Sequence, residues 1–132
     1  MTLSCELVSP EGLAYATDAH LVVAPGRDGD FGVLEHHAPL IASLRPGMIE
    51  IYATEQSKPV RRFITGGFAE VTGARCVILA EDISDPDNIN RAEAEAMLAE
   101  AREELRAATL PQEVAVAVRR IEQAEALLLI LP

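Results

Sequence analysis

The stretch Ser84-Asp85-Pro86-Asp87-Asn88-Ile89-Asn90-Arg91-Ala92-Glu93 divides the chain into two parts of different character. Its polar, proline-containing start interrupts any regular element. Asn90 is a favoured helix N-cap, and Glu93 follows three residues later, which is a capping-box arrangement. We therefore predict two domains, one over residues 1–84 and a helical one over residues 85–132.

C-terminal to this boundary, apolar residues recur at helical spacing on either side of a short turn, Thr109-Leu110-Pro111. Pro111 suits the first turn of a second helix. The stripe of the first helix consists of Ala94, Met97, Leu98, Ala101, Leu105 and Ala108. The stripe of the second helix consists of Val114, Val118, Ile121, Ala124 and Leu128. Two amphipathic helices joined by so short a turn predict an antiparallel hairpin.

The alanines in these stripes bring two helices close together but bury little apolar area, at about 25 cal/mol per Å². We therefore expect the hairpin alone to be marginally stable. Two interpretations stay open: a mobile element, or a hairpin permanently docked on the N-terminal domain. The apolar end, Leu127 to Leu131, is far shorter than the roughly 20 residues that span a bilayer, so we expect it to pack on protein.

N-terminal to the boundary, apolar and polar residues alternate with a period of two, which is typical of strands buried on one face. The clearest runs are Leu3, Cys5 and Leu7, then Leu21 and Val23, then Met48 to Tyr52, Val60 to Thr65, Phe68 to Val71 and Cys76 to Ala80. Turn signals such as Pro25-Gly26 and Thr72-Gly73 separate these runs. The pattern predicts an all-β sandwich or barrel followed by the α-helical hairpin.

The composition and the N-terminal sequence bear on the classes of binding partner and on the cellular compartment. A formal net charge of −10 argues against binding of nucleic acid or of an anionic lipid surface. Cys5 and Cys76 suit buried small hydrophobes in a reducing compartment, with a disulfide or a reactive thiol as the alternative. The N-terminus shows no signal-peptide pattern, so we expect a cytoplasmic protein or one on the cytoplasmic face of a membrane complex.

Motifs of catalysis and metal binding are incomplete. Asp30-Phe31-Gly32 matches a kinase tripeptide, but the glycine-rich loop and the catalytic-loop motif are missing. Asp28-Gly29-Asp30 resembles the start of a calcium loop, but Gly32 and Pro39 stand at two ligand positions. We expect no catalytic residue, no cofactor and no metal site, and so a binding or structural module.

Two pairs of adjacent residues, one of histidines and one of arginines, are weak candidates for a metal site and a phosphate site. His36 and His37 would point to opposite faces of a strand and so could not share a metal, and His20 adds little. Arg61 and Arg62 diverge in the same way, which favours a solvated strand with one arginine in a partner contact over a phosphate clamp.

A series of blocks covering most of residues 3–82 resembles the ATP synthase ε family. The family signature, usually G-[DE]-[FL]-G-[VI]-[LY]-P-G-H-A-P-L, is matched by Gly29-Asp30-Phe31-Gly32-Val33-Leu34 and then by His37-Ala38-Pro39-Leu40. Further blocks occur in order and at family spacing: Leu7 to Gly12, Val22 to Gly26, Leu44 to Ile49, Thr65 to Val71 and Val77 to Glu81. The blocks are highly specific together, although no single one would be.

The resemblance implies a β-sandwich of about ten strands followed by a helical hairpin. It implies a non-catalytic rotor subunit in the central stalk of a proton-translocating ATP synthase. Such a subunit binds the gamma subunit and the membrane c-subunit ring, and so couples rotation of the ring to the catalytic head. The implied location is peripheral, on the cytoplasmic face of the bacterial inner membrane, without insertion into it.

The resemblance also implies site residues. Gly29, Asp30, Phe31, Gly32 and His37 match the family loop that meets the ring, and Ser9 lies at a family position near gamma. Asp30 could accept hydrogen bonds from a basic ring residue, or be an ordinary turn carboxylate. Phe31 is either a hydrophobic plug at the interface or a core residue at a strand end.

Three departures from the family bear on function. Glu35-His36 replaces the usual Pro-Gly, so the shape and charge of that loop tip are expected to differ. Some relatives bind ATP through an I-D-x-x-R-A motif, where this chain has Asn90 in place of Asp and Glu93 in place of Arg. Because an acid at the cation's position repels phosphate, we expect no significant ATP binding.

The third departure concerns the hairpin. In some relatives it swings towards the alpha/beta head and inhibits ATP hydrolysis through basic residues of its second helix. Here that helix has only Arg119 and Arg120 against Glu113, Glu122 and Glu125. We expect a weak regulatory role or none, so that deletion of residues 85–132 leaves hydrolysis nearly unchanged.

Two other classes of function stand beside the rotor subunit: an unrelated carbohydrate- or peptide-binding sandwich with a helical tail, and a small enzyme. Co-purification with a multi-subunit membrane complex would separate the rotor subunit from both. Turnover of a substrate by the isolated chain would favour the enzyme.

Overall fold

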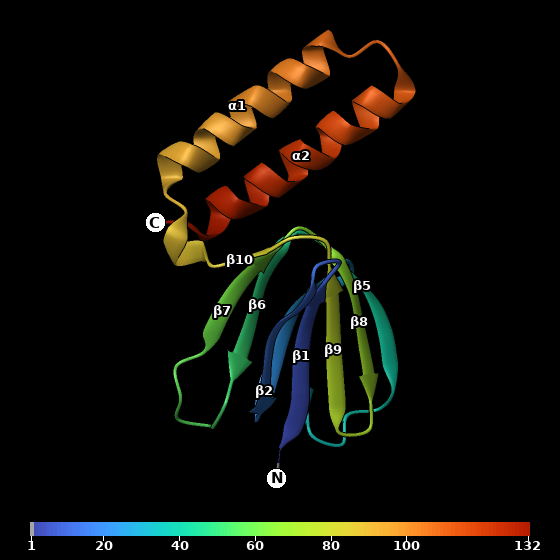
Figure 1. Cartoon of the computed structure of the whole chain (residues 1–132), viewed down its shortest axis with the longest axis vertical. Coiled ribbons are helices and arrows are strands. Elements are labelled where there is room, and N and C mark those ends of the chain that lie inside the picture. Colours follow the sequence, from blue (N-terminus) through green and yellow to red (C-terminus); the bar gives the residue numbers. More distant parts are fainter. Residues whose placement is uncertain (1) are drawn as a thin grey trace. The chain divides into compact units, whose positions relative to one another are not determined.

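The computed structural model describes residues 2–132, and the chain falls into two compact units (Figure 1). The first unit ends at Asp85, and the second is Pro86–Pro132. The first is built of strands and the second of helices, which confirms the predicted fold class. The predicted division into two domains, over residues 1–84 and 85–132, stays a prediction.

Ten strands form the first unit within the described residues. They are β1 (Leu3–Ser9), β2 (Gly12–Ala19), β3 (Leu21–Gly26), β4 (Gly29–Leu34), β5 (Leu40–Leu44), β6 (Gly47–Tyr52), β7 (Val60–Ile64), β8 (Gly67–Thr72), β9 (Arg75–Ala80) and β10 (Ile83–Ser84). Their order is β10-β7-β6-β3-β5-β8-β9-β1-β2, with β4 paired to β3. Neighbouring strands are antiparallel except β1 and β9, which run parallel.

The sheet folds into two layers. The single register pair Gly26–Leu44 joins a first sheet half, made of β10, β7, β6, β3 and β4, to a second sheet half, made of β5, β8, β9, β1 and β2. Buried aliphatic residues of both halves form one core cluster, and this makes the unit a sandwich.

Alternation along the strands selects the core residues as predicted in β1 and β6. Leu3, Cys5 and Leu7 are fully buried, and so are the two isoleucines of β6. In β3 the core face is carried by Val22 and Ala24, while Leu21 and Val23 share the opposite face. Such close-packed aliphatic layers resist deformation.

Cys5 and Cys76 are buried, unbridged and directly opposite each other across the parallel β1–β9 pair. The hydrogen bond with Cys76, together with burial, raises the pKa of the Cys5 thiol, so this thiol stays protonated and unreactive at neutral pH. Both side chains are fully buried and unbridged, so the two cysteines act as small buried hydrophobes.

The second unit is a short 3₁₀ turn, η1 (Pro86–Asn88), followed by the antiparallel helices α1 (Arg91–Ala107) and α2 (Pro111–Ile130), both visible in Figure 1. Pro111 is the first helical residue of α2, as predicted. The carboxylate of Glu113 accepts a hydrogen bond from the Leu110 backbone N–H at 3.0 Å, which caps the start of α2. Within residues 2–132, no helix combines the length and the hydropathy needed to cross a bilayer.

The packing face of α2 agrees with the predicted stripe only in part. Ala124 of that stripe is buried, and Ile121 and Leu128 are half-buried, whereas Val114 and Val118 are exposed. The other buried residues of α2 are Ala117 and Leu127. On α1 the predicted Ala94 and Ala101 are buried. Alanine allows the closest approach of two helix backbones, so the face with alanines forms the contact and the valine face is left outside. Because α2 is apolar on both faces, periodicity alone could not choose between them.

Candidate functional site

The β3–β4 turn is the first part of the sequence-predicted site. Gly26 and Gly29 face each other across it, and Pro25 is paired with Asp30. A Cβ atom at Gly26 would lie 2.5 Å from the carbonyl oxygen of Gly29, so only glycine allows the two strands to close here. The turn is therefore tight, and it fixes the position of Asp30 at the start of β4.

Asp30 already has a basic partner within its own chain. Arg45 Nη2 donates to Asp30 Oδ1 at 2.6 Å, and Arg45 Nη1 donates to the Gly26 carbonyl oxygen at 2.6 Å. The Arg45 backbone N–H also donates to the Pro25 carbonyl oxygen at 2.9 Å. The basic residue that hydrogen-bonds Asp30 in this structure thus belongs to the same chain.

The other residues of β4 alternate between the core and the outside. Phe31 is half-buried and packs against the core cluster, so of its two predicted roles the structure supports the core residue at a strand end. Asp30, Gly32 and Leu34 lie on the exposed face. Among the described strands, β4 pairs with β3 alone, so one edge of it is open to a partner.

His37 lies at the far end of β4 from Asp30. Four residue steps at about 3.3 Å each separate Asp30 from Leu34, so roughly 13 Å of strand lie between the two ends. The His37 backbone N–H donates to the Leu34 carbonyl oxygen at 3.2 Å, which closes the tip. The five residues matched to the ring contact therefore follow one strand and both its ends instead of forming one cluster.

The departure at Glu35-His36 places a non-glycine residue in a left-handed backbone conformation. His36 has a φ of 65°, which glycine adopts without strain, and it stands where the family usually has glycine. The expected difference in the shape and charge of the tip stays a prediction. His36 Nε2 lies 3.5 Å from Glu35 Oε1, a surface pair that contributes little to stability.

The substitution His36→Gly is expected to stabilise the protein by about 1 kcal/mol, because it removes left-handed strain from a non-glycine residue. The matched control His37→Gly relieves no such strain and is expected to destabilise the protein slightly. Urea unfolding of the two variants and the parent chain measures both effects. A loss of stability in His36→Gly equal to that in His37→Gly would contradict the left-handed backbone at position 36.

A second surface, which the sequence analysis did not single out, lies on the outward face of the second sheet half. Register pairs align Phe68 with Leu79, Leu79 with Val8, and Val8 with Leu13. We call these four residues the apolar row. Phe68 is 55% exposed and Leu13 is 61% exposed, so the row is an apolar strip across four strands, open to solvent.

Ser9 borders the apolar row, since it directly follows Val8 in β1. Its hydroxyl contacts the carbonyl oxygen of Gly12 at 3.5 Å across the β1–β2 turn. A sequence signal for the row did exist: Cys76 to Ala80 is a continuous apolar run, which indicates a strand covered on both faces.

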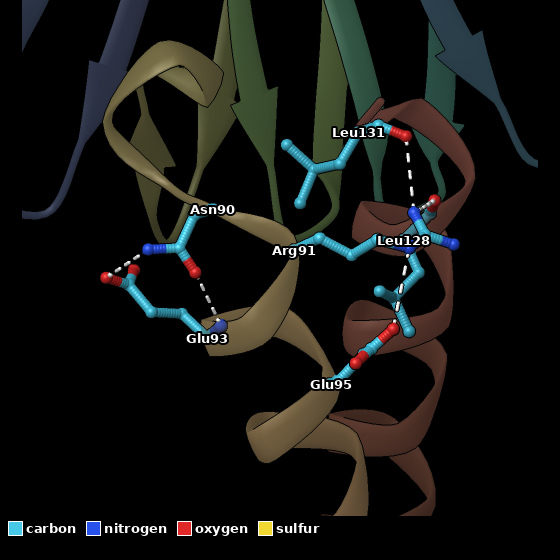
Figure 2. Close-up of polar contacts among 6 residues, drawn as sticks. All are labelled: Asn90, Arg91, Glu93, Glu95, Leu128 and Leu131. Carbon is cyan, nitrogen blue, oxygen red and sulfur yellow. Dashed lines mark hydrogen bonds and ion pairs between the residues drawn. The ribbon is translucent and has the colours of Figure 1, made fainter.

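At the start of α1, where the family's nucleotide motif would lie, the side chains hydrogen-bond to one another (Figure 2). Asn90 Oδ1 accepts from the Glu93 backbone N–H at 2.8 Å, and Asn90 Nδ2 donates to Glu93 Oε1 at 3.2 Å. The predicted N-cap is confirmed, but the glutamate bonds the asparagine side chain instead of its backbone N–H. The Glu93 N–H and carboxylate are therefore both engaged with Asn90.

Arg91 links the two helices at the same end of the hairpin. Its Nη1 donates to the carbonyl oxygens of Leu128 at 3.2 Å and Leu131 at 3.3 Å, and its Nε lies 3.5 Å from Glu95 Oε1 (Figure 2). A cation on the last carbonyls of a helix satisfies acceptors that have no partner within the helix.

Basic groups of α2 are partly neutralised inside the hairpin. Arg120 Nη1 donates to Glu104 Oε1 of α1 at 2.6 Å. One of the two arginines of α2 is thus paired with the neighbouring helix. In residues 2–132 there is also no group of three or more His, Cys, Asp or Glu side chains arranged to hold a metal ion.

Comparison with known proteins gives consistent matches along the chain. Residues 2–86 match the family model described as "ATP synthase, Delta/Epsilon chain, beta-sandwich domain". The ATP synthase epsilon chain of Rhodospirillum rubrum is 44% identical over 128 residues, covering 96% of this chain and 94% of the relative. That of Rhodospirillum centenum is 46% identical over 111 residues, covering 81% and 76%.

Two solved structures share the fold. One is a chain of the Euglena gracilis mitochondrial ATP synthase in an OSCP/F1/c-ring structure, with a TM-score of 0.82, 21% identity and coverage of 96% of this chain and 79% of that chain. The other is a chain from the central stalk/c-ring structure of the Tetrahymena thermophila mitochondrial ATP synthase, with a TM-score of 0.68, 16% identity and coverage of 96% and 94%.

Proposed function

The chain belongs to the epsilon-chain family of ATP synthases, and from this premise we propose that it transmits rotation of the membrane ring to the catalytic head through gamma. It is a stalk subunit and not the catalytic one. A part that transmits torque must not deform, and the aliphatic core shared by both sheet halves supplies that stiffness.

The observation that carries the proposal is the apolar row bordered by Ser9. A contiguous apolar strip on the surface of a protein with a net charge of −10 is a mark of a protein interface. We propose that gamma covers this row. Torque can pass through such a contact because the row lies directly over the rigid strands β8, β9, β1 and β2.

The ring contact is proposed for the exposed face and open edge of β4, at Gly29, Asp30, Gly32 and His37. Phe31 would support that contact from the core side. The first and second sheet halves thus provide different surfaces, one for the ring and one for gamma. The corresponding location is peripheral, on the cytoplasmic face of the bacterial inner membrane, where the ring and the gamma subunit meet.

Co-purification tests this function. Tagged full-length chain is expected to retain gamma and the membrane ring from detergent-solubilised membranes, and purified gamma alone is expected to bind it directly. Cells without the chain are expected to lose coupling between proton flow and ATP synthesis. Failure of gamma to bind, together with normal coupling in those cells, would overturn the proposal.

We propose that the hairpin has at most a weak effect on ATP hydrolysis and does not bind ATP. Glu93 turns its carboxylate to Asn90 at the position of the nucleotide motif, and Arg120 is held by Glu104, which leaves little positive charge for the alpha/beta head. Deletion of Pro86–Pro132 is expected to change the hydrolysis rate of the assembled complex less than about twofold. A several-fold rise, or micromolar ATP binding by calorimetry, would contradict this.

The same deletion tests the division into two domains. Asp85 pairs with Arg62 of β7 at 4.0 Å, so a chain ending at Asp85 keeps every strand and the contacts of its last residue with the sandwich. The shortened chain is expected to unfold cooperatively and to bind gamma like the full chain. A shortened chain that did not fold would show that the sandwich depends on the hairpin.

A further inference from the structure

One arginine side chain holds together the corner of the sandwich at the β3–β4 turn. Arg45 lies between β5 and β6, and its guanidinium reaches Asp30 on β4 and the Gly26 carbonyl oxygen on β3, each at 2.6 Å. Backbone hydrogen bonds from Arg45 to Pro25, at 2.9 Å, and from Arg27 to Ser43, at 2.9 Å, fasten the same corner. The position of Asp30 is therefore set by contacts from another part of the chain.

The charges of this corner balance. Arg27 and Asp28 occupy the turn itself, and Asp30 and Arg45 form the ion pair beside it, so two acidic and two basic side chains stand together. The surroundings are different, because the chain as a whole carries a net charge of −10. The turn is thus a locally neutral surface in an acidic protein.

Asp30 keeps hydrogen-bonding capacity within this neutral pair. Its side chain is 62% exposed, and Arg45 engages its Oδ1 atom. A carboxylate has about four lone-pair positions, so a single donor leaves room for others. An aligned acceptor and donor, side by side, suit a partner that offers polar groups without net charge.

We propose that Arg45 is a positioning residue, which orients Asp30 and cancels its charge, so that the ring meets a neutral hydrogen-bonding corner. The partner chemistry assigned to this corner is that of backbone amides, hydroxyls and side-chain amides in the ring loop, and not a basic residue. The inference rests on the proposed ring contact of β4. It differs from that proposal by naming Arg45 and by the class of group that Asp30 recognises.

The experiment compares Asp30→Asn, Arg45→Gln and the double variant in membranes from cells that lack the chain. Each full-length variant is added back, and ATP-driven proton pumping and the concentration needed to restore it are measured at low and high salt. Each single variant leaves one charge unpaired and is expected to raise that concentration roughly tenfold, with a new dependence on salt. The double variant is neutral again and is expected to return to within about threefold of the parent.

The control is Arg106→Gln, which breaks another exposed arginine pair, that of Arg106 and Glu103 on α1. Arg106 lies outside both proposed contact surfaces, so this change tests the loss of an exposed arginine pair by itself. The control is expected to leave pumping and its salt dependence unchanged. All variants are expected to bind gamma alone with the parent's affinity and to melt within a few degrees of the parent, which separates positioning from a loss of folding.

Two results would overturn the inference. If Asp30→Asn and the double variant are equally impaired while Arg45→Gln is normal, the ring reads the negative charge itself. If no variant differs from the parent, the corner does not meet the ring. A parent chain that fails to restore pumping or to bind gamma would instead refute the proposed function, whatever the role of Arg45.

Discussion

Replacing Gly67 with alanine is expected to destabilise the protein by about 4 kcal/mol. Gly67 has a φ of +147°, and a Cβ atom there would lie 1.9 Å from the carbonyl oxygen of Leu79 on β9. Strain at such a backbone angle costs about 1–3 kcal/mol, and forced overpacking adds about 1–3 kcal/mol. The clash involves backbone, so neither β8 nor β9 can yield by rotating a side chain. Urea unfolding of the full chain measures the loss.

Gly12→Ala is the matched control for this prediction. Gly12 has a comparable φ of +123°, but a Cβ atom there would have no neighbour within 4 Å. Its substitution is therefore expected to cost only the backbone strain, about 1–2 kcal/mol. Equal losses of stability in the two variants would show that the close approach of β8 to β9 does not restrict which side chain fits at position 67.

Local chemistry explains which parts of the fold could be predicted from the sequence. Alternation along β1 and β6 is decided within a few residues, and it correctly gave the buried faces of both strands. The cap at Asn90 and the helix start at Pro111 are also local, and both are confirmed. The hairpin followed from these patterns and from the family resemblance, whereas the strand count followed from the resemblance alone.

Features that depend on distant segments could not be predicted in this way. The parallel pairing of β1 with β9 joins residues about seventy positions apart, as in the pair of Glu6 and Arg75. The contact of Arg45 with Asp30 likewise links different strands. In α2 the choice between two apolar faces is made by close backbone approach at alanines, a property of the pair of helices and not of either sequence.

The candidate site shows the same division. Resemblance supplied Asp30, His37 and Ser9, and the structure adds how each is held: by Arg45, by the Leu34 carbonyl, and at the border of the apolar row. The row itself was missed, because its four members come from four strands and meet only through register. Their role and that of the ring residues stay predictions.

Phe68→Asp is expected to weaken binding to gamma at least about a hundredfold. Phe68 lies in the apolar row beside Leu79, and a carboxylate there would have to lose its water on binding without gaining a partner, which costs about 3 kcal/mol. Because residue 68 points away from the core, stability is expected to change by less than about 1 kcal/mol. Titration of gamma with each variant, followed by light scattering or calorimetry, measures the affinity.

Leu34→Asp makes the same chemical change on the first sheet half and serves as the control. Leu34 is 49% exposed, close to the 55% of Phe68, but it lies on β4, on the surface proposed for the ring. It is expected to leave affinity for gamma within about twofold of the parent while impairing restored proton pumping. Equal weakening of gamma binding by both variants would mean that charge, not place, causes the loss. Unchanged binding in Phe68→Asp would remove this part of the apolar row from the gamma contact, because an unpaired carboxylate buried in an apolar interface weakens binding strongly.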